Sequence, residues 1–558
     1  MFAAFRERVQ PRHVTLLLSL IIGALVGLVV VAFILITGRL TNNFYPHGSD
    51  RWRRIVIPVV GSLVTGFLLS RYFPNARGSG IPQTKFALFI NEGVIRFRTV
   101  LGKFLCCSLS LASGMALGRE GPSVHIGAGL ASLLGRRAGL PPDEVKALIP
   151  VGSTAALAAA FNTPIAAVLF SLEEILGDMH APVLGTAVIS AATSWVVLHL
   201  ILGDEPLFHV PSYQLVHPLE FGVYAVLGVV GGLASVLFVK LLLDLRRFFL
   251  HLPKSTVWLQ PVAGGLVVGL LGLFMPEVLG VGYGFVERVL GGDMALRTVA
   301  ILALFKIAAT ASGYASGNAG GIFGPSLFIG AMVGGTVGSV AHILLPGYTA
   351  NPGAYALVGM GTAFAGIVRT PLTSVIMIFE MTRDYSIIVP LMISNLIAFF
   401  VSARLQREPI YEALAHQEGV FLPAGEAREH LARLRVSDVM ESGPTIPGTS
   451  AVAGLPRGGW KAFPVTDNGT IIGILKHDSS ARAGPKTTAA ELADREYPYV
   501  HPDHPFSLAL ERMGANQLDL LPVVSRANIY KLLGVVTLSS ILKSYGLEIA
   551  LPDSTEAL

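Results

Sequence analysis

An apolar run near the N-terminus constrains the fold of this chain more than any other feature. No charged residue occurs from Val14 to Thr37, and the first one beyond the run is Arg39. About 20 apolar helical residues cross a ~30 Å hydrocarbon layer, and the run is too long for the apolar part of a cleaved signal. It therefore predicts a membrane span. Basic residues ahead of it predict a cytoplasmic N-terminus; these are Arg6, Arg8 and Arg12.

The distribution of charge separates a membrane body from a soluble tail. Charged residues make up 14% of the chain, against about 25% in a soluble globular protein. They are sparse between residues 14 and 400 and become frequent after about residue 404. We expect a membrane domain over residues 1–418 and a cytoplasmic domain over 424–558.

Two further features bear on partners and compartment. The net charge of +5 comes with no basic stripe of interleaved aromatic residues, so the expected partner is a lipid bilayer rather than nucleic acid. The only two cysteines, Cys106 and Cys107, are adjacent within an apolar stretch. Such neighbours are poor candidates for a structural disulfide, and we interpret them as packing residues.

The membrane body contains an internal repeat. Residues 121–128 recur at 324–331 with six identities in eight positions, a shift of 203 residues. At the same shift Lys103 aligns with Lys306. After a four-residue insertion the match resumes at a shift of 207, where Glu173 aligns with Glu380.

The repeat predicts an all-α body made of two copies, roughly 55–205 and 221–403. Several of its apolar segments are short or interrupted by Gly or Pro. Matching interruptions in two halves of a membrane protein indicate a binding site built from discontinuous helices.

The two copies differ at one informative place. Before the shared Gly-Pro-Ser, the first copy has Gly118-Arg119-Glu120 and the second has Gly321-Ile322-Phe323. Both are small-residue turns that lead into apolar helices, so each presents unpaired N–H groups and a positive dipole end. This arrangement predicts an anion site without a positive side chain. A third such turn, Gly78-Ser79-Gly80-Ile81-Pro82, adds a hydroxyl donor.

Glu120 has no acidic counterpart in the second copy. An ionised glutamate within a bilayer is costly and indicates function. Its carboxylate can occupy the anion site itself, and after protonation it can leave, so that one residue acts as gate and proton carrier. The alternative is a salt bridge with Arg119, but adjacent helical residues do not face each other.

In order and spacing, these three segments resemble the signature motifs of the CLC chloride channel and transporter family. The resemblance covers nearly the whole chain. It implies two inverted repeats of tilted, partly spanning helices, and a multi-pass homodimer in the plasma (bacterial inner) membrane with one anion path in each subunit. It also implies which residues bind chloride: Ser79, Gly80, Ile81, Arg119, Glu120, Gly121, Ile322, Phe323 and Tyr411. For Tyr411 the alternative is an interfacial tyrosine.

The resemblance implies H+/Cl− exchange if an internal glutamate relays protons, and Glu174 matches that position. Its neighbour Glu173 has a partner in the second copy, whereas Glu174 aligns with Met381. The alternative for Glu174 is a solvated cap near the inner face. Serine in the first motif resembles chloride-selective members. Lys103 and Lys306 either raise the potential along the anion path or pair with buried carbonyls.

The tail resembles a pair of CBS domains, roughly 433–482 and 487–548. The segment 436–440 predicts a helix start, and we expect strands at 462–467, 471–475, 521–524 and 532–536. CBS pairs can bind adenine nucleotides. Thr537 is the one candidate residue here, since Lys476 and Ser540 depart from the usual motif, so a dimer-stabilising platform is the favoured interpretation.

Chloride/proton exchange is the leading hypothesis, and no cofactor is expected. The alternative is a passive voltage- or ligand-gated chloride channel regulated by the tail, in which Glu120 only gates. An enzyme is not supported, because no metal-ligand cluster, nucleophile–base pair or phosphate-binding motif is present. A magnesium channel would require acidic clusters along its path. His125 aligns with Phe328, so packing explains it better than ligation.

Overall fold

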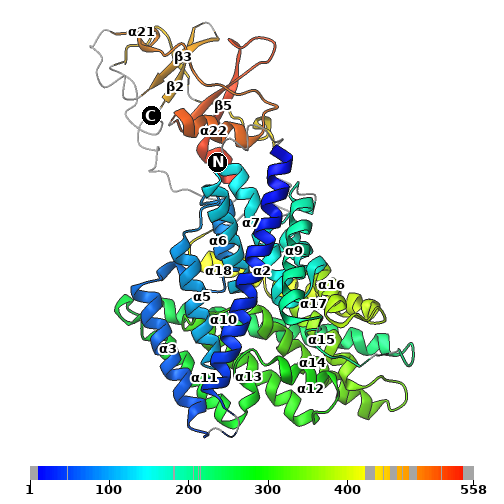
Figure 1. Cartoon of the computed structure of the whole chain (residues 1–558). Helices are drawn as coiled ribbons and strands as arrows, with labels where there is room; N and C mark the ends of the chain where they lie inside the picture. The colour runs from blue at the N-terminus through cyan, green and yellow to red at the C-terminus, as the bar shows by residue number, and fades with distance from the viewer. Residues whose placement is uncertain are drawn as a thin grey trace. The chain divides into compact units, whose positions relative to one another are not determined.

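The computed structural model describes residues 11–46, 48, 50–179, 182–204, 206–211, 213, 215–420, 434–443, 445–452, 462–467, 469–476, 487–516 and 518–544. The chain divides into two compact units, Met1–Leu422 and Pro423–Leu558. The first unit is helical, and the second combines short strands with helices (Figure 1).

The helices of the first unit follow the order of the sequence repeat. Those of the first half are α2 (Pro11–Phe44), α3 (Arg53–Arg71), α4 (Ile81–Phe89), α5 (Phe97–Ala112), α6 (Glu120–Arg137), α7 (Pro142–Phe161), α8 (Pro164–Phe170) and α9 (Leu184–Leu202). Those of the second half are α10 (Glu220–His251), α11 (Gln260–Phe274), α12 (Tyr283–Leu290), α13 (Leu296–Ala315), α14 (Phe323–Leu344), α15 (Pro352–Val368), α16 (Pro371–Thr382) and α17 (Ile388–Leu405). The last described helix of the unit is α18 (Ile410–Gln417).

Eight helices in the described part of the chain are long and apolar enough to cross a membrane. Others are too short to span, and the sequence explains why two of them begin where they do. A Thr-Pro pair follows α7 and α15, with Asn162 and Arg369 in left-handed conformation (φ 60° and 67°). Proline removes an N–H donor and disfavours helix in the residue before it, so each helix ends and a new one starts at Pro164 or Pro371.

The two halves pack alike. Helix α2 lies against α9 as α10 lies against α17, and α6 lies against α7 as α14 lies against α15 (Figure 1). Paired glycines permit this closeness: a Cβ on Gly127 would lie 2.3 Å from the Gly152 carbonyl oxygen, and one on Gly330 would lie 2.2 Å from that of Gly359. The first copy was expected to start at residue 55, which is too late. It begins with α2, which packs against α9 in the first half as α10 packs against α17 in the second. Cys106 and Cys107 are free and buried.

Within its described residues, the second unit contains two small sheets. Strands β1 (Ile446–Pro447), β2 (Ala462–Asp467) and β3 (Thr470–Lys476) form one, with β1 parallel to β2 and β2 antiparallel to β3. Strands β4 (Leu520–Val524) and β5 (Leu532–Thr537) form an antiparallel pair. Three short helices accompany them: α21 (Ala489–Leu492), α22 (Phe506–Asn516) and α23 (Leu538–Ser544).

The four expected strands of the tail are present within a residue or so of their predicted bounds. The expected helix start is wrong, because the segment forms only a 3₁₀ turn, Val436–Asp438. The Arg435 N–H donates to the Asp438 carboxylate at 2.7 Å, which closes that turn locally. Most of the glycine- and proline-containing stretch 450–460 lies outside the described residues.

Candidate functional site

The three turns singled out in the sequence meet at one place in the helical unit. Gly118 and Gly321 pair as an antiparallel bridge, each N–H donating to the other carbonyl at 2.7 Å. The sister helices α6 and α14 begin directly beyond this bridge. The Ser79 turn, residues 78–82, packs against the start of α6. A Cβ on Gly121 would lie only 2.7 Å from the Ser79 carbonyl oxygen. Only glycine permits this approach.

The helix starts at this point carry free donors. Among the described residues, the N–H groups of Gly121, Ile322 and Phe323 make no hydrogen bond. These residues are buried, and Phe323 packs against the rings of Phe161 and Phe364, with centroids 4.7 and 4.3 Å away. Buried unpaired N–H groups at helix N-termini favour an anion.

Glu120 lies among these donors with its side chain fully buried. Its Oε2 accepts a hydrogen bond from the Gly324 N–H at 3.1 Å, and its Oε1 accepts one from the Tyr283 hydroxyl. The Arg119 Nε is 3.9 Å from Oε1, at the limit of an ion pair. The carboxylate is therefore bound mainly by the second copy rather than by its sequence neighbour.

Hydroxyl groups complete the surroundings of the site. The Ser79 N–H donates to the Tyr314 hydroxyl at 3.3 Å, and Ser79 Oγ accepts from the Ile81 N–H at 3.4 Å. Gly80 allows this turn through its left-handed conformation, with φ at 105°. Tyr411 is 1% exposed, and its hydroxyl has no hydrogen-bond partner among the described residues. A buried phenol hydroxyl without a protein acceptor is able to donate to an anion.

Glu174 lies in a π-helical turn, Ser171–Leu176, that follows α8. Its carboxylate is buried and lies 2.7 Å from the Lys85 Nζ on α4, the helix that begins beside Ser79. A buried, ion-paired carboxylate does not match the solvated cap of the alternative interpretation, and the relay role of Glu174 stays a prediction. Sequence reasoning missed Lys85, although a lone lysine within an apolar segment was a signal for a buried partner.

Glu173 and Glu380 have matching structural roles. Glu173 accepts from the Thr373 N–H at 2.8 Å, at the start of α16, and Glu380 accepts from the Ala166 N–H at 2.6 Å, at the start of α8. Each copy thus caps a broken helix of the other copy. This exchange of caps explains why the two glutamates match in the sequence repeat.

The two buried lysines also have matching roles. The Lys103 Nζ donates to the carbonyls of Arg77 (3.0 Å) and Gly78 (2.9 Å), in the turn before α4. The Lys306 Nζ donates to the carbonyls of Val278 (3.0 Å) and Gly280 (2.6 Å), in the turn before α12. Of the two alternatives for these lysines, pairing with buried carbonyls is present.

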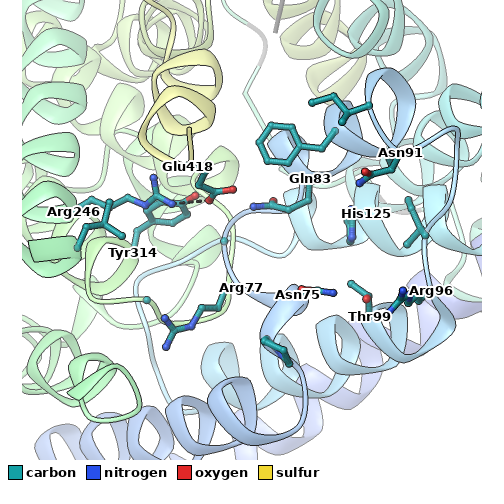
Figure 2. Close-up of a pocket in the computed structure, with 18 of the residues that line it drawn as sticks. Asn75, Arg77, Gln83, Asn91, Arg96, Thr99, His125, Arg246, Tyr314 and Glu418 are labelled. Carbon is teal, nitrogen blue, oxygen red and sulfur yellow. Dashed lines mark hydrogen bonds and ion pairs between the residues drawn. The ribbon is translucent and has the colours of Figure 1, made fainter. Parts of the chain in front are cut away.

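A cavity of about 930 Å³ borders the Ser79 turn. Figure 2 shows Arg246, Glu418 and Tyr314 on one side of it and His125 on the other. Arg246 and Glu418 form an ion pair at 2.6 Å. Tyr314 lines the cavity and also accepts a hydrogen bond from the Ser79 N–H, so the cavity lies next to the Ser79 turn.

In the second unit, Thr537 caps α23. Its Oγ1 accepts from the Ser540 N–H at 3.0 Å, while the Ser540 Oγ accepts from the Thr537 N–H at 3.2 Å. This reciprocal capping box accounts for both hydroxyls without a ligand. Nucleotide binding there remains a prediction.

Comparisons with known proteins agree with this architecture. Residues 61–403 match the family described as voltage gated chloride channel, and residues 489–546 match the CBS domain. The first predicted CBS unit, 433–482, stays a prediction. The chain is 32% identical over 421 residues to the H(+)/Cl(−) exchange transporter ClcA of Vibrio campbellii, covering 72% of this chain and 89% of that protein. It is 35% identical over 366 residues to a putative chloride channel protein, ClcB-like, of Ralstonia nicotianae, covering 64% and 85%.

Solved structures share the fold. A slow cyanobacterial Cl−/H+ antiporter superposes with a TM-score of 0.66 at 26% identity, covering 74% of this chain and 98% of that chain. A eukaryotic CLC transporter superposes with a TM-score of 0.65 at 21% identity, covering 94% and 97%. The chain therefore belongs to the voltage-gated chloride channel (CLC) family and carries a C-terminal CBS domain.

Proposed function

We propose that this protein exchanges chloride for protons across a membrane, with Glu120 as both gate and proton acceptor. The position of the Glu120 carboxylate carries the proposal. It accepts a hydrogen bond from the Gly324 N–H at the start of α14, where a helix N-terminus would otherwise bind an anion. An ionised carboxylate there excludes chloride. Protonation removes the charge that holds it, so the side chain can leave and chloride can enter.

The anion path uses donors that hold chloride without a full positive charge. The Ser79 and Tyr411 hydroxyls and the N–H groups of Ile322 and Phe323 coordinate the ion. Gly80, Ile81 and Gly121 shape the turns around it, and Arg119 raises the local potential. The cavity beside Ser79 serves as the approach from the cytoplasm, and its arginine side chains Arg77 and Arg96 attract anions, while Arg246 is paired with Glu418.

The proton path leads from the cytoplasm through Glu174 to Glu120. A buried carboxylate needs a partner to stay ionised, and Lys85 supplies one at 2.7 Å. Glu174 can therefore exchange a proton within the membrane unit without being free in water. Two relatives support proton exchange, though not the residues that carry it, by their names: the Vibrio protein is an H(+)/Cl(−) exchange transporter and the cyanobacterial one a Cl−/H+ antiporter.

A passive chloride channel is the second candidate, favoured by the name of the Ralstonia relative. In that case Glu120 opens and closes the path, and Glu174 has no role in transport.

The assembly and orientation are part of the proposal. The protein forms a homodimer in the plasma (bacterial inner) membrane, with one anion path per subunit and with its N-terminus and CBS tail in the cytoplasm. The tail acts as a dimer-stabilising platform. An adenine nucleotide at Thr537 is disfavoured by the capping role of that side chain.

The test is chloride-driven proton movement in liposomes that contain the purified protein, with chloride and pH recorded together. We expect a chloride gradient to move protons uphill. Glu120→Gln and Glu174→Gln should abolish the proton movement while chloride still passes. Chloride flow without proton movement in the unmodified protein would establish the channel and remove the relay role of Glu174.

A further inference from the structure

Helix α12 is the sister of α4, although the two turns before them share few residues. Gly280-Val281-Gly282-Tyr283 lies in the second copy where Gly78-Ser79-Gly80-Ile81 lies in the first, at a shift of 202 residues. Both helices start after a left-handed glycine, Gly80 at φ 105° and Gly282 at φ 85°. The buried lysines hold the carbonyls of both turns.

The two sister turns present different hydroxyl groups to the site. The first copy offers Ser79 just before its helix, whereas the second copy has Val281 at that position and cannot donate from it. The second copy instead has Tyr283 where the first has Ile81. The Tyr283 hydroxyl donates to the Oε1 of Glu120, while the Gly324 N–H donates to Oε2. Both donors that hold the carboxylate therefore come from the second copy.

Packing fixes the ring of Tyr283 in this position. Phe208, which is 2% exposed, meets it edge-on at a centroid distance of 5.5 Å. The Arg119 guanidinium lies over its face, 5.5 Å from the centroid. The phenol is thus preorganised toward Glu120 and does not have to be ordered when the carboxylate arrives.

Three charged or titratable groups interact with the Glu120 carboxylate among the described residues. They are Arg119, from the turn before α6, Tyr283, from α12, and Tyr411, from α18. The start of α14 contributes only the backbone N–H of Gly324. The Ser79 turn, residues 78–82, contains no ionisable side chain.

We propose that Tyr283 is a positioning residue of the gate. Its hydroxyl holds the ionised carboxylate of Glu120 at the start of α14 and so keeps the anion path closed until Glu120 takes up a proton. When the protonated side chain leaves, the Tyr283 hydroxyl and the Gly324 N–H are two buried donors without an acceptor, and a chloride ion satisfies both. The inference rests on the proposed gating role of Glu120, but it does not require proton coupling.

Tyr283→Phe removes the hydroxyl and keeps the ring packing. Loss of one hydrogen bond to a charged group corresponds to roughly a tenfold change in equilibrium. The closed position of the Glu120 side chain should be weakened by that factor. We expect chloride efflux from liposomes at neutral pH to rise several-fold and its pH profile to move upward. Tyr224→Phe is the control, because Tyr224 is buried and stacks on Tyr355 instead of contacting Glu120.

The decisive variant combines Tyr283→Phe with Glu120→Gln. If the hydroxyl acts through the carboxylate, it should change neither efflux nor the pH profile once that carboxylate is gone. An unshifted profile in the single variant, or an equal increase in the Glu120→Gln background, would overturn the inference. Proton movement recorded in the same liposomes tests the exchange proposal separately, since its absence leaves the effect on efflux measurable.

Discussion

The two copies of the repeat build the same backbone frame and equip it with different side chains. Both contain a buried lysine that holds the turn before a short helix, and both contain a glutamate that caps a helix of the other copy. The residues that differ lie around the proposed anion site. Glu120 of the first copy aligns with Phe323 of the second, and Ser79 aligns with Val281. Shared residues maintain the frame, and unshared residues carry out the proposed transport chemistry.

This division has a physical basis. A broken helix inside a membrane leaves backbone groups without partners, and each break must be satisfied wherever it occurs. Both copies have such breaks, so both keep Glu173 or Glu380 and Lys103 or Lys306. The proposed proton path needs no second copy, and its carboxylates, Glu120 and Glu174, align with Phe323 and Met381 in the other half.

The largest expected effect falls on the shared lysines. Lys306→Met leaves the carbonyls of Val278 and Gly280 buried without donors, which costs on the order of 3 kcal/mol of folding free energy. Lys103→Met should cost a similar amount. Thermal unfolding of the purified protein in detergent measures both, with Lys254→Met, in an exposed turn, as the control. A large drop in unfolding temperature for one lysine variant and none for the other would show that the two lysines do not have equivalent structural roles.

The next effect concerns Lys85, whose ion pair with Glu174 has no counterpart in the second copy. Lys85→Met leaves a buried carboxylate without a cation and favours its protonated form. We expect chloride-driven proton movement at neutral pH to slow roughly tenfold, with chloride flow largely kept. Lys85→Arg should restore much of the rate. Unchanged proton movement in Lys85→Met would remove Lys85 from the proton path.

A smaller and symmetrical effect is expected at the exchanged caps. Glu173→Gln and Glu380→Gln each weaken hydrogen bonds from a helix N-terminus to a carboxylate, at about 1–2 kcal/mol per variant. Their unfolding temperatures should fall by similar amounts. If the two differ widely, the caps are not equivalent, and the shared glutamates have acquired separate roles.

The smallest effect is expected in the tail, outside the repeat. Thr537→Val removes the hydroxyl that accepts from the Ser540 N–H, at a cost of about 1 kcal/mol. Limited proteolysis of the full-length protein should cleave the tail faster, while transport in liposomes stays unchanged. Tight binding of an adenine nucleotide that this substitution abolishes would instead support the nucleotide site.

The sequence predicted the frame of the site better than its contacts. The three glycine-rich turns, the repeat and the unmatched Glu120 were all visible along the chain, because each is a local pattern or a comparison of two segments. Tyr283, Tyr314 and Lys85 were missed, since they meet their partners Glu120, Ser79 and Glu174 only through the fold. In the sequence, the correspondence between α12 and α4 is marked mainly by the two glycines on either side of Val281, which match those on either side of Ser79.

The measurement that tests the central claim most directly compares two adjacent carboxylates, the shared Glu173 and the unshared Glu174. Chloride-driven proton movement and chloride flow should be recorded in the same liposomes for Glu173→Gln and Glu174→Gln. We expect Glu174→Gln to lose proton movement and keep chloride flow, and Glu173→Gln to keep both in the folded fraction. Loss of proton coupling in Glu173→Gln with normal coupling in Glu174→Gln would contradict the division between frame and chemistry.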